Sequence, residues 1–170
     1  LAESYEYSDD RLVATYHLRH GVKWHDGEDF NADDVVMSFN MLRDYRLGTA
    51  APFVGALEDT VAVDEYTVEV HYSEKQAFNL AAAILILPEH IWGGMSLEDV
   101  ALFANSEPIG TGPMRFADWT EGTTITLSRN EDYYGTPAGP GRIVFVQYGN
   151  EDVMAQALKS GEIDIVTEIS

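Results

Sequence analysis

Several side chains between His17 and Asp29 have the chemistry of metal ligands or acid–base catalysts: His17, His20, His25, Asp26, Glu28 and Asp29. Imidazole nitrogens and carboxylate oxygens are common ligands of zinc and other transition metals. The stretch around His17, however, alternates like a strand, so that His17 and His20 would point to opposite faces. His25 and Asp26 fall in a turn, where polar residues are expected without any chemistry. We therefore predict no metal site.

The other catalytic patterns are equally weak. Gly110-Thr111-Gly112 could suggest a phosphate-binding loop, but no Gly-Lys-Ser/Thr follows, and Pro113 lacks the amide proton that such a loop would use. A tight turn between domains is the better interpretation. With 29 acidic residues, nearby carboxylate pairs carry little information, and no Gly-x-Ser-x-Gly motif is present. His71 and His90 are isolated in the sequence and are expected at the surface or at a helix cap. We predict that the protein is not an enzyme and needs no cofactor.

Composition excludes further classes of function. The formal net charge is -19 over 170 residues, which argues against binding to nucleic acid or to anionic lipid. There are no cysteines, hence no disulfides and no thiolate chemistry. The longest apolar run, residues 80–87, is too short to span a bilayer, and the chain does not open with a signal peptide. An acidic surface on a soluble protein is the simplest interpretation, and a salt-adapted source is a sharper one.

The local patterns predict a set of strands and capped helices. Residues 18–39 read as a strand, a turn around Gly27 and a helix from Ala32 to about Tyr45, with Asn31 as N-cap and Asp34 completing a capping box. A hairpin is expected to lead into this unit, and residues 58–72 have the alternation of a second hairpin. Further expected elements are an apolar helix over 76–87, a short turn at 88–92 and a helix from Leu97 to about Ala104.

The remaining sequence, from residue 105 onward, predicts a second structural unit. The Gly- and Pro-rich residues 105–113 form the best candidate boundary. A hairpin is expected over 114–129. The run Arg142–Tyr148 has the continuous apolar centre of a strand buried on both faces. A helix over 151–160, capped by Asn150 and ended by Gly161, and a strand over 163–166 would then complete a parallel βαβ unit.

Several segments resemble one family of proteins. Leu18–Phe39, LRHGVKWHDGEDFNADDVVMSF, is similar to the LRxGVKWHDGxxFxAxDVVxSF segment of the family 5 solute-binding proteins, which serve ABC importers for oligopeptides, dipeptides and nickel complexes. Ile86–Trp92 resembles ILPKHIW, Pro108–Pro113 resembles PIGTGP, and Arg129–Gly135 resembles RNPDYWG. Ala157–Asp164 is similar to ALKSGEID. These motifs follow the family's order and extend over essentially the whole chain.

The resemblance implies a mixed α/β (α+β) fold, part of the first lobe of a type II periplasmic-binding-protein-like structure. Residues 1–106 would form the extra α+β subdomain of this lobe and residues 107–170 part of its main α/β subdomain, with the second lobe absent. It implies a monomeric receptor that captures oligo- or dipeptides by closure of two lobes and delivers them to ABC permease subunits. The expected location is periplasmic or extracellular, with a lipid anchor left open.

The resemblance leaves alternatives and names two residues. Receptors for nickel chelates or oligosaccharides use the same fold, and a metal-dependent hydrolase is a more distant alternative. By position, Phe53 in a loop and Ile84 before the ILPEHIW segment would face the ligand cleft. Phe53 as a packing residue is an equally open interpretation, and Trp24 and Trp92 read as core residues.

Overall fold

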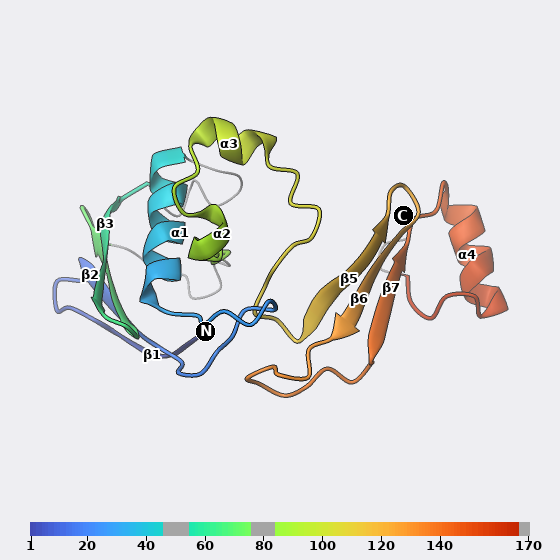
Figure 1. Cartoon of the computed structure of the whole chain (residues 1–170), viewed down its shortest axis with the longest axis horizontal. Coiled ribbons are helices and arrows are strands. Elements are labelled where there is room, and N and C mark those ends of the chain that lie inside the picture. Colours follow the sequence, from blue (N-terminus) through green and yellow to red (C-terminus); the bar gives the residue numbers. More distant parts are fainter. Residues whose placement is uncertain (46–54, 76–83, 167–170) are drawn as a thin grey trace.

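The computed structural model describes residues 1–45, 55–75 and 84–166. Two antiparallel sheets lie on opposite sides of the segment 103–113, which connects them (Figure 1). The first sheet has the strand order β1-β2-β4-β3, with β1 Ala2–Tyr7, β2 Val13–Leu18, β3 Leu57–Asp64 and β4 Thr67–Tyr72. The second has the order β5-β6-β7, with β5 Met114–Thr120, β6 Thr124–Arg129 and β7 Arg142–Val146. Both predicted N-terminal hairpins and the predicted 114–129 hairpin are confirmed.

Side-chain caps mark the starts of α1, α3 and α4, whereas α2 begins after Pro88 without one. They are α1 Ala32–Tyr45, α2 Glu89–Trp92, α3 Leu97–Leu102 and α4 Glu151–Ser160. The Asn31 side chain accepts a hydrogen bond from the Asp33 amide at 2.8 Å, and Ser96 and Asp99 form a complete capping box. Asn150 accepts from the Val153 amide, and Gly161 ends α4 in the left-handed region at φ 77, which glycine adopts without steric cost.

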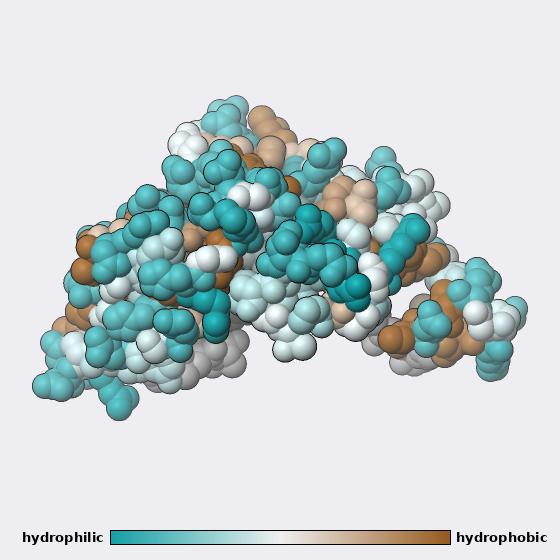
Figure 2. Space-filling view, turned by 60° about the horizontal axis from the view of Figure 1, so that its bottom comes forward, coloured by the Kyte–Doolittle hydropathy of each residue, from teal (hydrophilic) through white to brown (hydrophobic). Residues whose placement is uncertain are grey.

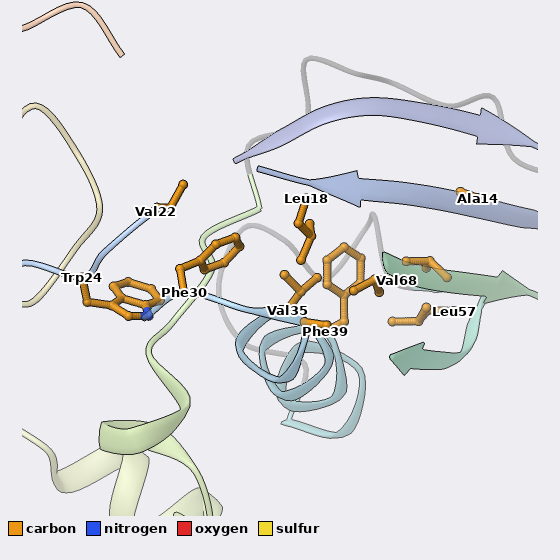
Figure 3. Close-up of a cluster of buried hydrophobic side chains, with 11 residues drawn as sticks. Ala14, Leu18, Val22, Trp24, Phe30, Val35, Phe39, Leu57 and Val68 are labelled. Atoms are coloured by element: carbon orange, nitrogen blue, oxygen red, sulfur yellow. The ribbon is translucent and has the colours of Figure 1, made fainter. Parts of the chain in front are cut away.

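The core lies between the first sheet and α1. Alternate residues of β2 and β4 point to one face, because side chains of a strand alternate. On this face Ala14, Val68 and Val70 are fully buried. Val35 and Phe39 of α1 point toward these strands, at the i, i+4 spacing that places them on one face of the helix (Figure 3). The remaining buried members of the cluster are Leu18, Val22, Trp24, Phe30, Ala32 and Leu57.

The segment between β2 and α1 is a short loop of close turns. A single β-bridge pairs Lys23 with Asp29, and Phe30 donates its amide proton to the Val22 carbonyl at 3.0 Å. Gly27 has φ 99, a conformation that favours glycine. Phe30 packs edge-on against Trp24 with ring centroids 6.2 Å apart. The predicted turn and the core role of Trp24 are confirmed.

The predicted helix over 76–87 is wrong at its described end. Residues 76–83 lie outside the described part, and residues 84–88 have no regular secondary structure. The physical reason is that Pro88 disfavours helical geometry in the preceding residue. In addition, the Leu87 amide donates to the Ser38 hydroxyl at 2.8 Å, so α1 takes up a backbone group that a helix would use internally.

The predicted parallel βαβ unit is also wrong. β7 pairs antiparallel with β6, and residues 163–166 are not in a strand. β7 is not buried on both faces, since Val144, Phe145 and Val146 are 45%, 51% and 43% exposed. A continuous apolar run indicates that both faces of a strand are suited to burial, but burial also requires other elements that pack against both faces. The proposed boundary between residues 106 and 107 stays a prediction.

We predict that the stability of the first sheet depends on the buried face of β4. Val68→Ala should lower the free energy of unfolding by about 2 kcal/mol, because it leaves a cavity at a fully buried position. Val63→Ala is the matched control: its side chain is 55% exposed, and the loss should stay below about 1 kcal/mol. Urea unfolding followed by circular dichroism measures both, and equal losses would contradict this assignment of the core.

Candidate functional site

The segment that carries the predicted cleft residue Ile84 is fixed against α1 by side chains of that helix. The Ser38 hydroxyl accepts a hydrogen bond from the Leu87 amide and donates one to the Asp34 carbonyl at 2.7 Å. The Asp34 carboxylate accepts from the Glu89 amide at 2.8 Å, at the start of α2. Both Ser38 and Asp34 are buried, so these bonds are shielded from water. The backbone is therefore held against α1 at Leu87 and Glu89.

Asp34 is the central polar group of this region. It is 3% exposed, and its Oδ2 atom accepts from the Trp24 indole Nε1 at 3.2 Å and from the Asn31 amide at 3.0 Å. With the Glu89 amide on Oδ1, three N–H groups from three segments converge on one carboxylate. Among the residues that the structure describes, no cation forms an ion pair with it. Oriented N–H donors thus stabilise the buried charge without a counter-ion.

The two predicted cleft residues differ in what the structure describes. Phe53 lies outside the described residues. Ile84 is half-buried and packs against the core cluster, whereas the next residue, Leu85, is 78% exposed. Membership of Ile84 in a ligand cleft stays a prediction.

The turn that follows Trp24 makes long-range contacts that sequence reasoning missed. The His25 Nδ1 atom accepts from the Gly110 amide at 3.2 Å, and its Nε2 atom lies 3.0 Å from the Gly112 carbonyl oxygen. The neighbouring Asp26 carboxylate lies 2.7 Å from Nε2 of His90 in α2. His90 is exposed, as predicted, and the contact with Asp26 is an addition that the sequence did not indicate. No local signal could reveal these partners, which lie 64 to 87 residues away in the sequence.

The environment shifts the titration of this turn. Burial lowers the pKa of His25 below its ordinary 6.5, and the nearby Arg115 guanidinium acts in the same direction, while the Gly112 carbonyl and Asp26 oppose the shift. Burial alone would raise the pKa of Asp26, but hydrogen bonds from His90 and from the Glu28 amide outweigh it, and the pKa is lowered. At neutral pH His25 is thus neutral and Asp26 ionised.

The other candidate metal ligands are dispersed among separate partners. His20 stacks against the Tyr66 ring with centroids 4.0 Å apart, and Asp29 pairs with Lys23 at 2.6 Å. His71 lies 3.2 Å from Glu69 on its own strand. Within residues 1–45, 55–75 and 84–166, no three His, Asp or Glu side chains are arranged to hold a metal ion.

The second sheet presents an open apolar face. Trp119, Ile125 and Phe145 are directly opposite one another across the three strands and are 49%, 43% and 51% exposed. They line a shallow hollow together with Gly122, Thr123, Thr124, Val146 and Gln147.

Most of the face seen in Figure 2 is hydrophilic, in keeping with the net charge of -19, and hydrophobic residues gather toward the end that holds α4.

Comparisons with known proteins identify the class of this fold. An Oligopeptide-binding protein AppA from Bacillus subtilis is 33% identical over 141 residues, covering 79% of this chain and 26% of that protein. A Brucella ovis protein named for peptide binding in an ABC transporter is 32% identical, covering 96% of this chain and 32% of its own length. Bacillus subtilis AppA bound to a nonapeptide superposes with a TM-score of 0.89 at 28% identity, covering 96% of this chain and 34% of that one. NikZ from Campylobacter jejuni with Ni(L-His) gives 0.88 at 27% identity, covering 96% and 33%.

The family itself follows from a match to the whole chain. The model of bacterial extracellular solute-binding proteins, family 5 (middle region), covers residues 1–170, and the chain belongs to this family. The predicted family and the type II binding-protein fold are confirmed. Members are substrate-binding components that act outside the cytoplasmic membrane. The chain spans about a third of the length of the relatives it matches. None of the described helices is both long and apolar enough to cross a bilayer.

We predict that the Asp34 carboxylate cannot be replaced by an amide. Asp34→Asn puts an NH₂ group against at least one of the three N–H donors and should lower the free energy of unfolding by about 2–3 kcal/mol. Asp33→Asn, at the exposed adjacent position, is the control and should cost less than about 1 kcal/mol. Urea unfolding measures both values, and comparable losses would show that the carboxylate is not the connecting group.

Proposed function

We propose that the protein is the substrate-binding component of an ABC importer that captures oligo- or dipeptides outside the membrane. Its mechanism is non-covalent: two lobes close over the peptide and present it to the permease subunits. The observation that carries this proposal is the superposition of 96% of the chain on AppA bound to a nonapeptide, at a TM-score of 0.89. NikZ bound to Ni(L-His) superposes with a TM-score of 0.88, which keeps a receptor for nickel chelates as the second candidate.

Several features of this chain support a binding role over catalysis. The imidazoles and carboxylates that looked most like chemistry make structural contacts with backbone groups or with one another. In this proposal residues 1–106 form the extra subdomain and residues 107–170 begin the main subdomain of the first lobe. The protein works as a monomer without a cofactor or catalytic residues, in the periplasm or at the outer cell surface.

The proposal predicts that ligand capture needs both lobes. The 170-residue chain spans about a third of its relatives, so on its own it should supply at most part of a cleft and bind peptides weakly or not at all. Isothermal titration of this chain with a mixed peptide library should give no submicromolar binding. Native mass spectrometry of the full-length protein, purified gently, should instead detect a retained peptide. A retained nickel chelate would favour the second candidate, and turnover of the ligand would revive an enzymatic function.

The proposal also assigns Ile84 and Phe53 to the cleft. In the full-length protein, Ile84→Ala should weaken peptide affinity by about five- to tenfold through lost apolar contact area. Leu85→Ala is the matched control, because the adjacent side chain is 78% exposed and is not among those packed against the core cluster. Titration calorimetry and thermal melting, run on both variants, separate binding from stability. A variant at Ile84 that loses stability but keeps its affinity would assign this residue to packing alone.

A further inference from the structure

The His25–Gly27 turn connects two segments that are far apart in the sequence. His25 contacts residues 110–112, the segment leading into the second sheet. Asp26, the next residue, contacts His90 of α2. Each contact uses one imidazole. The His25 contact requires a neutral ring, whereas the His90 contact is also compatible with a charged ring. Neither contact is part of the proposed binding function.

The His25 contact requires a neutral imidazole. Its Nδ1 atom accepts the Gly110 amide proton, so Nδ1 carries no proton, and Nε2 must carry one and donate it to the Gly112 carbonyl. The backbone adds a bond from the His25 amide to the Gly110 carbonyl at 2.9 Å. Protonation of Nδ1 would place two N–H groups against each other. The hydrogen bond to Gly110 is therefore incompatible with a charged His25.

The His90 contact tolerates a charged imidazole. Nε2 of His90 lies 2.7 Å from the Asp26 carboxylate, and a proton on this nitrogen is donated to it in either charge state. A charged His90 would turn this hydrogen bond to an ionised carboxylate into an ion pair, so the contact does not require a neutral ring. Acidification thus disfavours the His25 contact of this turn but not the His90 contact.

We propose that the His25–Gly27 turn is a pH-sensitive connection, in which acidification breaks the hydrogen bond from the Gly110 amide to His25 while the Asp26–His90 contact to α2 is retained. Above the pH at which His25 becomes protonated, the turn is hydrogen-bonded both to α2 and to the segment that leads into the second sheet. Below that pH, the entry segment keeps the bond from the His25 amide to the Gly110 carbonyl and the bond from the Asn130 side chain to the Gly112 carbonyl at 3.0 Å, but the Gly110 amide has lost its acceptor.

Burial and the charged groups around the turn determine the direction in which the pKa of His25 is shifted. Asp26 faces His25 from its own turn and favours protonation, whereas Arg115 of β5 opposes it. Burial, the largest influence, lowers the pKa of His25 below 6.5. A group whose pKa is lower in the folded state stabilises the fold above its ordinary pKa and loses this contribution as the pH falls. Around His90 the facing groups are Asp26 and the edge of the Trp24 ring, with Glu89 beside it on α2. Loss of the hydrogen bond from the Gly110 amide is therefore expected below about pH 6.5.

Amide exchange of the ¹⁵N-labelled chain, followed by NMR and corrected for the intrinsic rate at each pH, tests the proposal. As the pH is lowered from about 7.5 until the His25 ring is doubly protonated, protection of the Gly110 amide should fall at least about fivefold, the loss expected for one hydrogen bond. The Glu89 amide, which donates to Asp34, should keep its protection. The imidazole ¹⁵N shifts of His25 should change from an unprotonated Nδ1 to a doubly protonated ring over the same range.

Two variants make the test specific. In His25→Gln, which cannot titrate, protection at Gly110 should no longer depend on pH. In the control His71→Gln, which changes an imidazole that lies 3.2 Å from Glu69 on β4, the pH dependence should match the wild type. Constant protection of Gly110 in the wild type, a pH dependence that survives in His25→Gln, or an equal loss at Glu89 would each overturn the proposal.

Discussion

The buried carboxylate of Asp34 is the interaction on which the rest of the first unit depends. Removing an ionised group from water costs several kcal/mol unless donors replace the lost hydration. Here the donors are the Trp24 indole and two backbone amides, one at the start of α1 and one at the start of α2. Because backbone amides cannot rotate toward another partner, they fix where three segments meet. The carboxylate therefore defines geometry as well as contributing stability.

This geometry determines what the neighbouring residues can do. With α1 fixed at its first turn, Val35 and Phe39 face the buried side of the first sheet, and Ser38 faces the Leu87 backbone. The segment 84–88 is thereby bound to a helix instead of forming one. A binding residue on such a segment would be held by its backbone, which is the arrangement that gives a ligand contact a defined position.

Sequence patterns predicted the features that depend on neighbouring residues, such as helix caps and strand alternation. They missed the features that depend on residues distant in the sequence. The caps at Asn31 and Asn150 and the alternation along β4 need only neighbouring residues, and the structure confirms each of them. Asp34 was recognised only as a capping partner, because its bonds to Trp24 and Glu89 require the folded topology. The role of His25 was missed for the same reason: its partner Gly112 is 87 residues away. The apolar run of residues 142–148 indicated a buried strand, but burial depends on what covers it.

The two sheets differ in how much core each one buries, and this difference makes the contacts between the two units relevant to stability. The first sheet has its own helix and a continuous core, whereas the buried side chains of the second unit are few: Thr126, Asn130 and Ala157 among the described residues. Its apolar face, with Trp119 and Phe145 about half exposed, contributes little burial. The order of the second sheet within this chain must then come partly from the first unit. The available links are the hydrogen bonds of His25 and the Arg19 guanidinium, which lies 5.6 Å from the centre of the Tyr134 ring. Ile109 and Tyr134 also pack against the core of the first unit, so a change in protonation of His25 acts on one of several contacts between the two units.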